Sequence, residues 1–297
     1  MLRNLLIVSL LIVGLTACVP ITPAPSALET TRVRNEASAG QLDANGTTPA
    51  ASPIDPATAL GDLRLTILYD NPGVDSRLGS GWGFAALVEY EDRTVLFDTG
   101  ADGSILLYNM RLLDVEPQAI EAIVLSHSHD DHTGGLQALL DTGIRPVVYS
   151  PPLFPDAFKE RVRAQTELVE VTGTREILPG IYLTGSYSKS VEQALVVETQ
   201  DGTVVITGCG HPGIVAMVHQ AQVVLPGKVA LLAGGFHLLD VPASEQQSVV
   251  AELRRLGVQR VLPTHCTGDS AIELFRTEFG ENCLEGGVGR VVLSSDW

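Results

Sequence analysis

Positive charge is scarce in this chain of 297 residues, which has 19 Lys and Arg, three of them lysines, against 35 Asp and Glu. The formal net charge of −16 would repel a phosphate backbone, and the sequence shows no local basic patch, so we expect no nucleic-acid partner. Hydrophobic residues make up 45% of the chain and charged residues 18%. These proportions exclude an intrinsically disordered protein and predict a folded one.

Cysteine is also scarce, and the four cysteines are Cys18, Cys209, Cys266 and Cys283. Because Cys18 belongs to an N-terminal segment, the folded part keeps an odd number, which argues against a full disulfide framework. Cys209 and Cys266 each lie near a histidine in a turn rich in glycine or threonine, which favours a thiol in a functional site. A Cys209–Cys266 disulfide is the alternative.

One apolar run, from Leu5 to Leu15, is shorter than the roughly 20 residues that a membrane-spanning helix needs. Arg3 precedes it and small residues follow it, the pattern of a secretory signal peptide. The final Leu-Thr-Ala-Cys resembles the lipobox of bacterial lipoproteins, which implies a signal peptide over residues 1–17 and a lipid on Cys18. An uncleaved anchor or an ordinary signal peptide are the alternatives. We expect an extracytoplasmic protein that is lipid-anchored to a bacterial membrane.

Residues 18–60 are rich in Pro, Ala, Thr, Ser and Asn, as in PITPAPSA, and show neither the period of a strand nor that of a helix. This composition predicts a low-complexity linker between the lipid anchor and the folded part. Residues 61–297 remain for one domain of two similar halves, without an internal sequence repeat.

Short segments rich in β-branched and apolar residues predict strands along the whole domain. We expect strands at residues 63–70, 84–90, 93–97, 122–126, 146–150, 167–171, 181–185, 194–199, 203–208, 228–235, 259–265 and 289–295. Helical patterns occur at residues 102–113, about 133–141, 213–220, 244–256 and 271–279. Strands and helices alternate in both halves, which predicts an α/β protein whose sheets are covered by helices.

The densest chemical signal is HSHDDH, residues 127–132, directly after a predicted buried strand. Residues two apart in an extended segment point the same way, so His127 and His129 can converge on one metal ion. Asp131 and His132, at the turn into the next helix, can face a second ion. A solvated polar loop is the alternative. Imidazoles with a carboxylate suit Zn²⁺ and, less exclusively, Fe or Mn²⁺.

This segment, HSHDDHTGG, resembles the H-x-H-x-D-H motif of the metallo-β-lactamase superfamily. Upstream, LFDTG resembles its first motif, in which Asp98 would orient the metal-binding loop as a partner of the ligands. Downstream, ITGCGHPGI, LLAGGFHLL and LPTHCTG are similar to the branch of metal-dependent hydrolases grouped with the methanopterin-pathway dihydropterin ribofuranosylaminobenzene phosphate synthase. The resemblance extends from about Leu63 to the C-terminus. It implies an αβ/βα four-layer sandwich of two mixed sheets flanked by helices.

The resemblance also implies two metal ions. The first would be held by His127, His129 and a third histidine, and the second by Asp131, His132 and His265.

The chain departs from the superfamily pattern at two positions. Glu192 stands where the third histidine is usual, and Cys209 stands where a bridging aspartate is usual, with His211 two residues on. We therefore predict His211 as the third ligand of the first ion. We predict that Cys209 lines the substrate pocket, with metal ligation as the alternative.

The two remaining histidines have no metal role in the superfamily pattern. His237 follows two glycines in GGFHL, and we expect it to contact substrate, with a structural cap as the alternative. His219 lies in a helical pattern and is expected at the surface.

Three features narrow the activity that the resemblance implies. The motif carries His129 rather than the glutamate of flavodiiron oxidoreductases, His132 is a residue that secreted β-lactamases usually lack, and the GHTPG-type motif of glyoxalase relatives is missing. We therefore expect a binuclear hydrolase in which water activated by the ions attacks an ester or phosphoester of a small molecule, with Asp131 handling the proton. The alternatives are a dihydropterin-type synthase that displaces diphosphate and a non-enzymatic binding lipoprotein.

Overall fold

The computed structural model describes residues 62–186 and 191–297. The predicted signal peptide, the lipid-modified cysteine and the linker lie outside these residues. Within the described part, no helix is long and apolar enough to cross a membrane.

The first of two mixed sheets has seven strands in the order β13-β1-β2-β3-β4-β5-β6. Strands β13, β1, β2 and β3 pair antiparallel, whereas β3, β4, β5 and β6 pair parallel. The strands are β1 (Leu63–Tyr69), β2 (Ala85–Tyr90), β3 (Arg93–Phe97), β4 (Ala122–Val124), β5 (Val147–Ser150), β6 (Leu168–Glu170) and β13 (Val291–Leu293).

The second sheet has six strands in the order β12-β11-β10-β9-β8-β7. Here β10, β11 and β12 run parallel, and β7, β8, β9 and β10 pair antiparallel. The strands are β7 (Arg175–Leu178), β8 (Ile181–Leu183), β9 (Leu195–Thr199), β10 (Gly202–Thr207), β11 (Val229–Gly235) and β12 (Val258–Thr264).

The main core lies between the two sheets. Successive residues of a strand point to opposite faces, so each strand contributes to this core and also to the packing against the helices. In β3, Val95 and Phe97 pack against residues of the second sheet, such as Leu195 and Leu231. Leu96, between them, points the other way and packs against helices. Burial on both faces explains why these strands are continuous apolar runs in the sequence.

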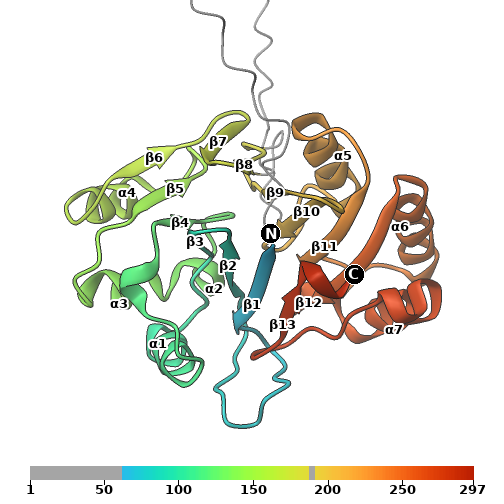
Figure 1. Ribbon diagram of the computed structural model, residues 1–297, viewed down its shortest axis with the longest axis horizontal. Helices are drawn as coiled ribbons and strands as arrows, with labels where there is room; N and C mark the ends of the chain where they lie inside the picture. Colours follow the sequence, from blue (N-terminus) through green and yellow to red (C-terminus); the bar gives the residue numbers. More distant parts are fainter. Residues whose placement is uncertain (1–61, 187–190) are drawn as a thin grey trace, which may run out of the picture. The chain divides into compact units, whose positions relative to one another are not determined.

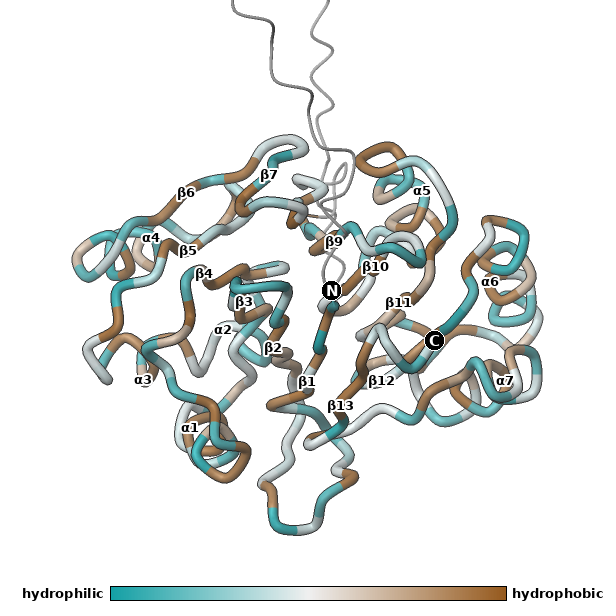
Figure 2. Tube along the Cα trace, viewed as in Figure 1, coloured by the Kyte–Doolittle hydropathy of each residue, from teal (hydrophilic) through white to brown (hydrophobic). Residues whose placement is uncertain are grey.

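Helices cover the outer face of each sheet, which gives four layers (Figure 1). Helices α1 (Gly103–Leu112), α3 (Leu136–Asp141) and α4 (Asp156–Arg163) cover the first sheet. Helices α5 (Ile214–Val224), α6 (Ala243–Arg255) and α7 (Asp269–Phe279) cover the second. Apolar and polar segments alternate along these helices, as expected for elements with one buried face (Figure 2). The predicted α/β sandwich is confirmed.

The predicted helix over residues 133–141 is wrong in its bounds. The chain instead forms α2 (Asp130–Thr133) and α3, separated by Gly134 and Gly135. A Cβ atom on Gly134 would lie 2.2 Å from the Ala101 carbonyl oxygen, and one on Gly135 would lie 2.1 Å from that of Thr99. Because only glycine permits this close approach, the HSHDDH motif enters a short helix that packs closely against the loop after β3.

Candidate metal centre

The predicted site residues follow the carboxyl ends of strands in both sheets. Asp98 follows β3, His127 lies three residues after β4, Cys209 follows β10, His237 follows β11 and His265 follows β12. Strands β3 and β4 are parallel, as are β10, β11 and β12, so each set delivers its side chains to one edge of its sheet. The two edges meet, and the rings of His132 and His265 lie 5.0 Å apart between centroids.

Three histidines form a first cluster whose donor atoms all lie within 4.8 Å of one another: His127, His129 and His211. His127 Nε2 lies 3.0 Å from His129 Nδ1. Two nitrogens bound to one tetrahedral Zn²⁺ lie roughly 3.3 Å apart, so this pair fits a shared ion. The structure therefore brings His211 to the two motif histidines, where the sequence places the third ligand.

The His211 loop is held by Glu192, a carboxylate that is 1% exposed. Its oxygens accept hydrogen bonds from the backbone N–H groups of Cys209, Gly210 and His211, each at 2.8 Å. Oε2 also lies 2.9 Å from His211 Nδ1, which leaves Nε2 for the cluster. Glu192 thus supports a histidine that comes from a different loop, and this explains why no histidine is needed at its own position.

A second cluster has four donors within 4.8 Å of one another: Asp131, His132, Cys209 and His265. Cys209 Sγ lies 3.2 Å from His132 Nε2 and 3.4 Å from His265 Nε2. Asp131 Oδ2 lies 3.4 Å from His265 Nε2. The placement of Cys209 among these donors favours metal ligation, the alternative in the sequence prediction, over a role confined to lining the pocket.

Buried polar partners orient the histidines of this second cluster. Asp98, which is fully buried, accepts hydrogen bonds from the Ser126 backbone N–H and hydroxyl, and its Oδ2 lies 2.7 Å from His132 Nδ1. This contact leaves His132 Nε2 for the cluster. The structure thus places Asp98 where the sequence predicted an orienting residue.

Asn71 is a residue of this site that the sequence analysis missed. Its Oδ1 lies 3.1 Å from His265 Nδ1, and its Nδ2 donates to the His265 carbonyl oxygen at 2.8 Å. Asn71 lies just after β1, and the contact spans 194 residues of sequence. The sequence signal for this role is an asparagine just after a predicted strand, which is too common to indicate a functional residue.

Burial and neighbouring charges shift the pKa values of these groups. Burial lowers the pKa of His127 to about 2, so its imidazole is neutral. Burial alone would raise the pKa of Glu192, but the hydrogen bond with His211 and those from the backbone N–H groups of Gly210 and His211 lower it to about 2. Burial likewise opposes ionisation of Asp131, yet the hydrogen bond with His265 and the charge of His132 lower its pKa. Neutral imidazoles and carboxylate anions are the forms that bind metal ions.

The thiols of Cys209 and Cys266 influence each other. Their hydrogen bond, followed by burial, raises the pKa of Cys209, and the same hydrogen bond lowers the pKa of Cys266. A thiol that coordinates a metal ion loses its proton outright, so a raised pKa in the metal-free protein is compatible with ligation. All three cysteines of the described part are free, so the disulfide alternative does not occur in this structure.

His237 lies beside both clusters. Its ring centroid is 4.5 Å from that of His211, and its donor atoms, with those of Cys209 and His211, form a third close group. His219 is exposed on α5, where the sequence placed it.

Backbone strain is concentrated at the site. Five non-glycine residues of the described part have positive φ, and three of them are Asp98, His237 and His265, at 57°, 54° and 54°. This left-handed conformation is unfavourable for residues with a Cβ atom and persists where the surroundings enforce it.

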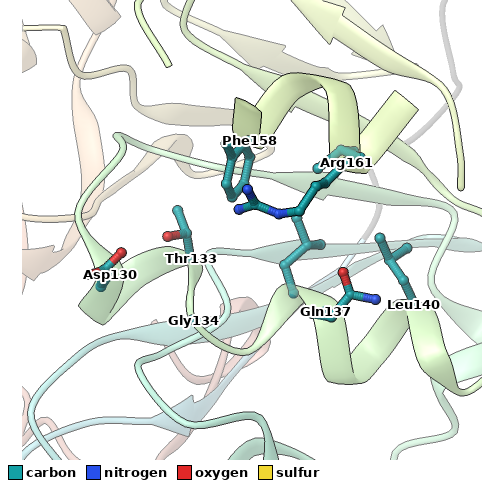
Figure 3. A pocket seen from close by; sticks show the side chains of 9 residues that line it. Asp130, Thr133, Gly134, Gln137, Leu140, Phe158 and Arg161 are labelled. Atoms are coloured by element: carbon teal, nitrogen blue, oxygen red, sulfur yellow. The ribbon is translucent and has the colours of Figure 1, made fainter. Parts of the chain in front are cut away.

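A cavity of about 170 Å³ lies behind the metal-binding loop, between α2, α3 and α4 (Figure 3). Asp130 and Thr133 line it from α2, and Phe158 and Arg161 line it from α4. None of the clustered donors lines this cavity. Asp130, although part of the six-residue motif, therefore belongs to a different face of the loop from Asp131.

A comparison with protein-family models agrees with the fold and the donor clusters. The family model described as "Metallo-beta-lactamase superfamily" matches residues 81–275. The chain belongs to this superfamily. Its members typically bind metal ions, and both donor clusters consist of side chains that suit Zn²⁺.

Curated relatives support the predicted branch of the superfamily. The 7,8-dihydropterin-6-methyl-4-(β-D-ribofuranosyl)-aminobenzene-5'-phosphate synthase of Methanocaldococcus jannaschii is 30% identical over 278 residues, covering 76% of this chain and 95% of that protein. The anti-Pycsar protein Apyc1 of Saccharibacillus brassicae is 26% identical over 213 residues, covering 58% of this chain and 86% of that protein.

Solved structures within the superfamily share the fold. Tm1679, described as a metal-dependent hydrolase of the β-lactamase superfamily, has a TM-score of 0.68 and 27% identity, and the match covers 77% of this chain and 98% of that chain. YhfI of Bacillus subtilis has a TM-score of 0.60 and 15% identity, covering 79% and 100%. The predicted superfamily and fold class are confirmed.

Proposed function

We propose that the protein is a binuclear metal-dependent hydrolase that cleaves an ester or phosphoester of a small molecule. The observation that carries this proposal is the pair of adjacent donor clusters, which lie at the carboxyl-end edges of the two sheets. The first would hold an ion through His127, His129 and His211, and the second through the donors Asp131, His132, Cys209 and His265. Imidazole, carboxylate and thiolate together favour Zn²⁺, with Mn²⁺ or Fe as other occupants of the same site.

When bound, two such ions lower the pKa of water to near neutrality and polarise a carbonyl or phosphoryl oxygen. The protein's own residues supply the positioning and the proton transfer. Asp131 has a side chain that is 20% exposed, whereas those of His132 and His265 are fully buried. The Asp131 carboxylate is thus the partly exposed donor of this cluster, and we assign it the role of accepting the proton of the attacking water and returning it to the leaving group.

We also propose that the enzyme is lipid-anchored outside the cytoplasm and acts on a small molecule. The lipobox-like Leu-Thr-Ala-Cys segment supports the anchor. The net charge of −16 supports a substrate other than nucleic acid.

Metal analysis and a substrate screen on the full chain test the hydrolase proposal. We expect two Zn²⁺ per chain by elemental analysis and turnover of at least one phosphodiester, phosphomonoester, carboxylic ester or lactone. The double variant His127→Ala/His129→Ala should lose at least one ion and its activity, whereas His219→Ala, on the exposed face of α5, should lose neither. Two bound ions without turnover of any of these classes would contradict hydrolysis and leave the synthase and the binding lipoprotein as candidates.

A synthase is the second candidate, and the 30% identity to the Methanocaldococcus jannaschii synthase favours it. In that case the same clusters would stabilise a departing diphosphate while a carbon nucleophile attacks the methylene carbon of a dihydropterin. Diphosphate release from a dihydropterin-6-methyl diphosphate that requires the aminobenzene substrate would establish the synthase. Release without that requirement would establish hydrolysis.

A further inference from the structure

A cavity of about 260 Å³ lies beside the two donor clusters. Its walls come from three segments that are far apart in the sequence: the loop between β1 and β2, the loop between β11 and α6, and the turn after β12. It is lined by Trp82, His237, Leu239, Asp240, Val241 and Cys266. We call this cavity the Trp82 pocket.

Two residues that line the Trp82 pocket, Trp82 and His237, each lie against a histidine of one cluster. The Trp82 ring lies 5.0 Å from the His265 ring between centroids, and His237 lies 4.5 Å from His211 by the same measure. Cys266 is the chain neighbour of His265. A molecule whose reacting group lies between the clusters would therefore extend its nearest substituent into this pocket.

The lining shows which substituent fits. Trp82 and Leu239 are 53% and 51% exposed, so two large apolar side chains face solvent at the same cavity. Exposed apolar side chains that line a concave surface mark a binding site. An indole ring adds a face on which another ring can stack.

Size and charge narrow the ligand further. The cavity is larger than the roughly 150 Å³ that holds benzene in a protein interior, so a substituted or fused ring fits. Asp240 is exposed and contributes the carboxylate of the lining, which disfavours an anionic substituent on the ring.

We infer that the Trp82 pocket binds a planar, uncharged aromatic portion of the substrate, with Trp82 as the stacking surface that determines specificity. This inference rests on the proposed function, because the group to be cleaved must lie between the clusters for the rest of the substrate to reach the pocket. It restricts the substrates to aryl esters, aryl phosphoesters or close equivalents.

Three phosphonates with the same head group, compared at an alkaline pH at which each is a dianion, test the inference on the zinc-loaded full chain by titration calorimetry. Phenylphosphonate should bind about tenfold more tightly than methylphosphonate, and several-fold more tightly than cyclohexylphosphonate, since only a flat ring stacks on indole. Trp82→Ala should reduce the phenyl preference to less than about threefold without changing methylphosphonate affinity. Trp82→Phe, which keeps an aromatic face, should retain most of the preference.

A matched pair of leucines provides the control. Leu239→Ala should weaken phenylphosphonate binding, whereas Leu153→Ala, which removes a side chain that is 72% exposed outside the pocket, should leave it unchanged. Equal affinities for the methyl, cyclohexyl and phenyl compounds would overturn the inference alone. If no phosphonate binds, the proposed metal-anchored function is overturned, and this inference falls with it.

Discussion

At the residue scale, each histidine of the second cluster has one nitrogen directed at the cluster because another residue occupies the other nitrogen. Asp98 contacts Nδ1 of His132, and Asn71 contacts Nδ1 of His265. Such contacts fix the tautomer and the orientation of a ligating imidazole. The metal affinity of the second cluster should therefore depend on these partners as well as on its own donors.

The Asn71 contact gives the first prediction. Asn71→Ala removes the acceptor that faces His265 Nδ1, so the affinity of the second cluster for Zn²⁺ should fall by about 10- to 100-fold. The first cluster does not contact Asn71 and should keep its ion. Competition with a chromogenic chelator measures both ions separately. Asn71→Asp, which keeps an acceptor oxygen, should restore much of the affinity, and equal weakening of both ions would contradict the assignment.

Cys209 gives the second prediction. Because its Sγ lies among the nitrogens of the second cluster, the zinc-loaded protein should show a sulfur neighbour near 2.3 Å by X-ray absorption, in addition to imidazole nitrogens near 2.0 to 2.1 Å. Cys209→Ser should abolish the sulfur neighbour and weaken the second ion. Cys283→Ser, outside both clusters, should leave the spectrum unchanged. A sulfur neighbour that survives in Cys209→Ser would point to Cys266 instead.

The sequence predicted the donors better than their partners. His127, His129, Asp131 and His132 lie within six residues of the chain. Extended geometry after a strand suggests that His127 and His129 converge, and the turn that follows suggests that Asp131 and His132 face a second ion. The roles of Glu192 and Asn71 depend on contacts across 19 and 194 residues, and no local pattern encodes them. Cys209 was the residue whose role stayed open, because a turn after a strand can face either the cluster or the pocket.

At the element scale, Asp70 joins the ends of two strands from different sheets. It lies at the end of β1, is fully buried, and accepts hydrogen bonds from the Asn71 backbone N–H and the hydroxyl of Thr264, at the end of β12. Burial raises the pKa of Asp70 to about 6, although the Thr264 and Asn71 hydrogen bonds oppose this. This contact thus holds Asn71 and His265 near each other, but burial of the ionised Asp70 carboxylate destabilises the folded protein.

A pH-dependent stability follows from this raised pKa. Between pH 4 and 6 the folded protein holds more of the Asp70 proton than the unfolded chain does, so the contribution of Asp70 to the free energy of unfolding falls as pH rises through this range. Asp70→Asn, which stays neutral, should remove roughly 2 to 3 kcal/mol of this fall. Urea denaturation of the chelator-treated protein from pH 4 to 7 measures it. The exposed Asp201→Asn serves as control, and an unchanged pH slope in Asp70→Asn would refute the prediction.

Elements with strong patterns were predicted, and those with weak patterns were missed. Helices α1, α5, α6 and α7 occur within a few residues of their expected bounds. Helix α4 and strand β7 were not predicted. Helix α4 has one buried residue, Val162, and β7 has none, so neither segment forms a long apolar run in the sequence. The division between α2 and α3 depends on backbone crowding at two glycines, which periodicity does not detect.

At the scale of the whole molecule, the fold class was predictable because both sheets are apolar on two faces and helices alternate with strands. The order of the strands in each sheet was not predictable, since it depends on which strands pair with each other across long stretches of sequence.

The predicted lipid anchor gives a test on the whole chain. Cys18→Ser removes the thiol that would carry the lipid, so the protein should leave the membrane fraction or remain unprocessed. Fractionation and intact-mass measurement on a bacterial host that processes lipoproteins detect either outcome, with Cys283→Ser as the matched control. An unchanged mass and unchanged membrane partition would rule out acylation.

Each of the two donor clusters contains residues from both halves of the domain. His127, His129, Asp131 and His132 precede β9, whereas Cys209, His211 and His265 follow it, so each cluster draws on both sides. A chain cut between β8 and β9 would give two fragments, each with an incomplete set of donors for either ion. Because each ion would need donors from both fragments, zinc binding would strengthen the association of the two fragments, and a chelator would weaken it. The metal ions would then stabilise the association of the two halves as well as take part in the reaction.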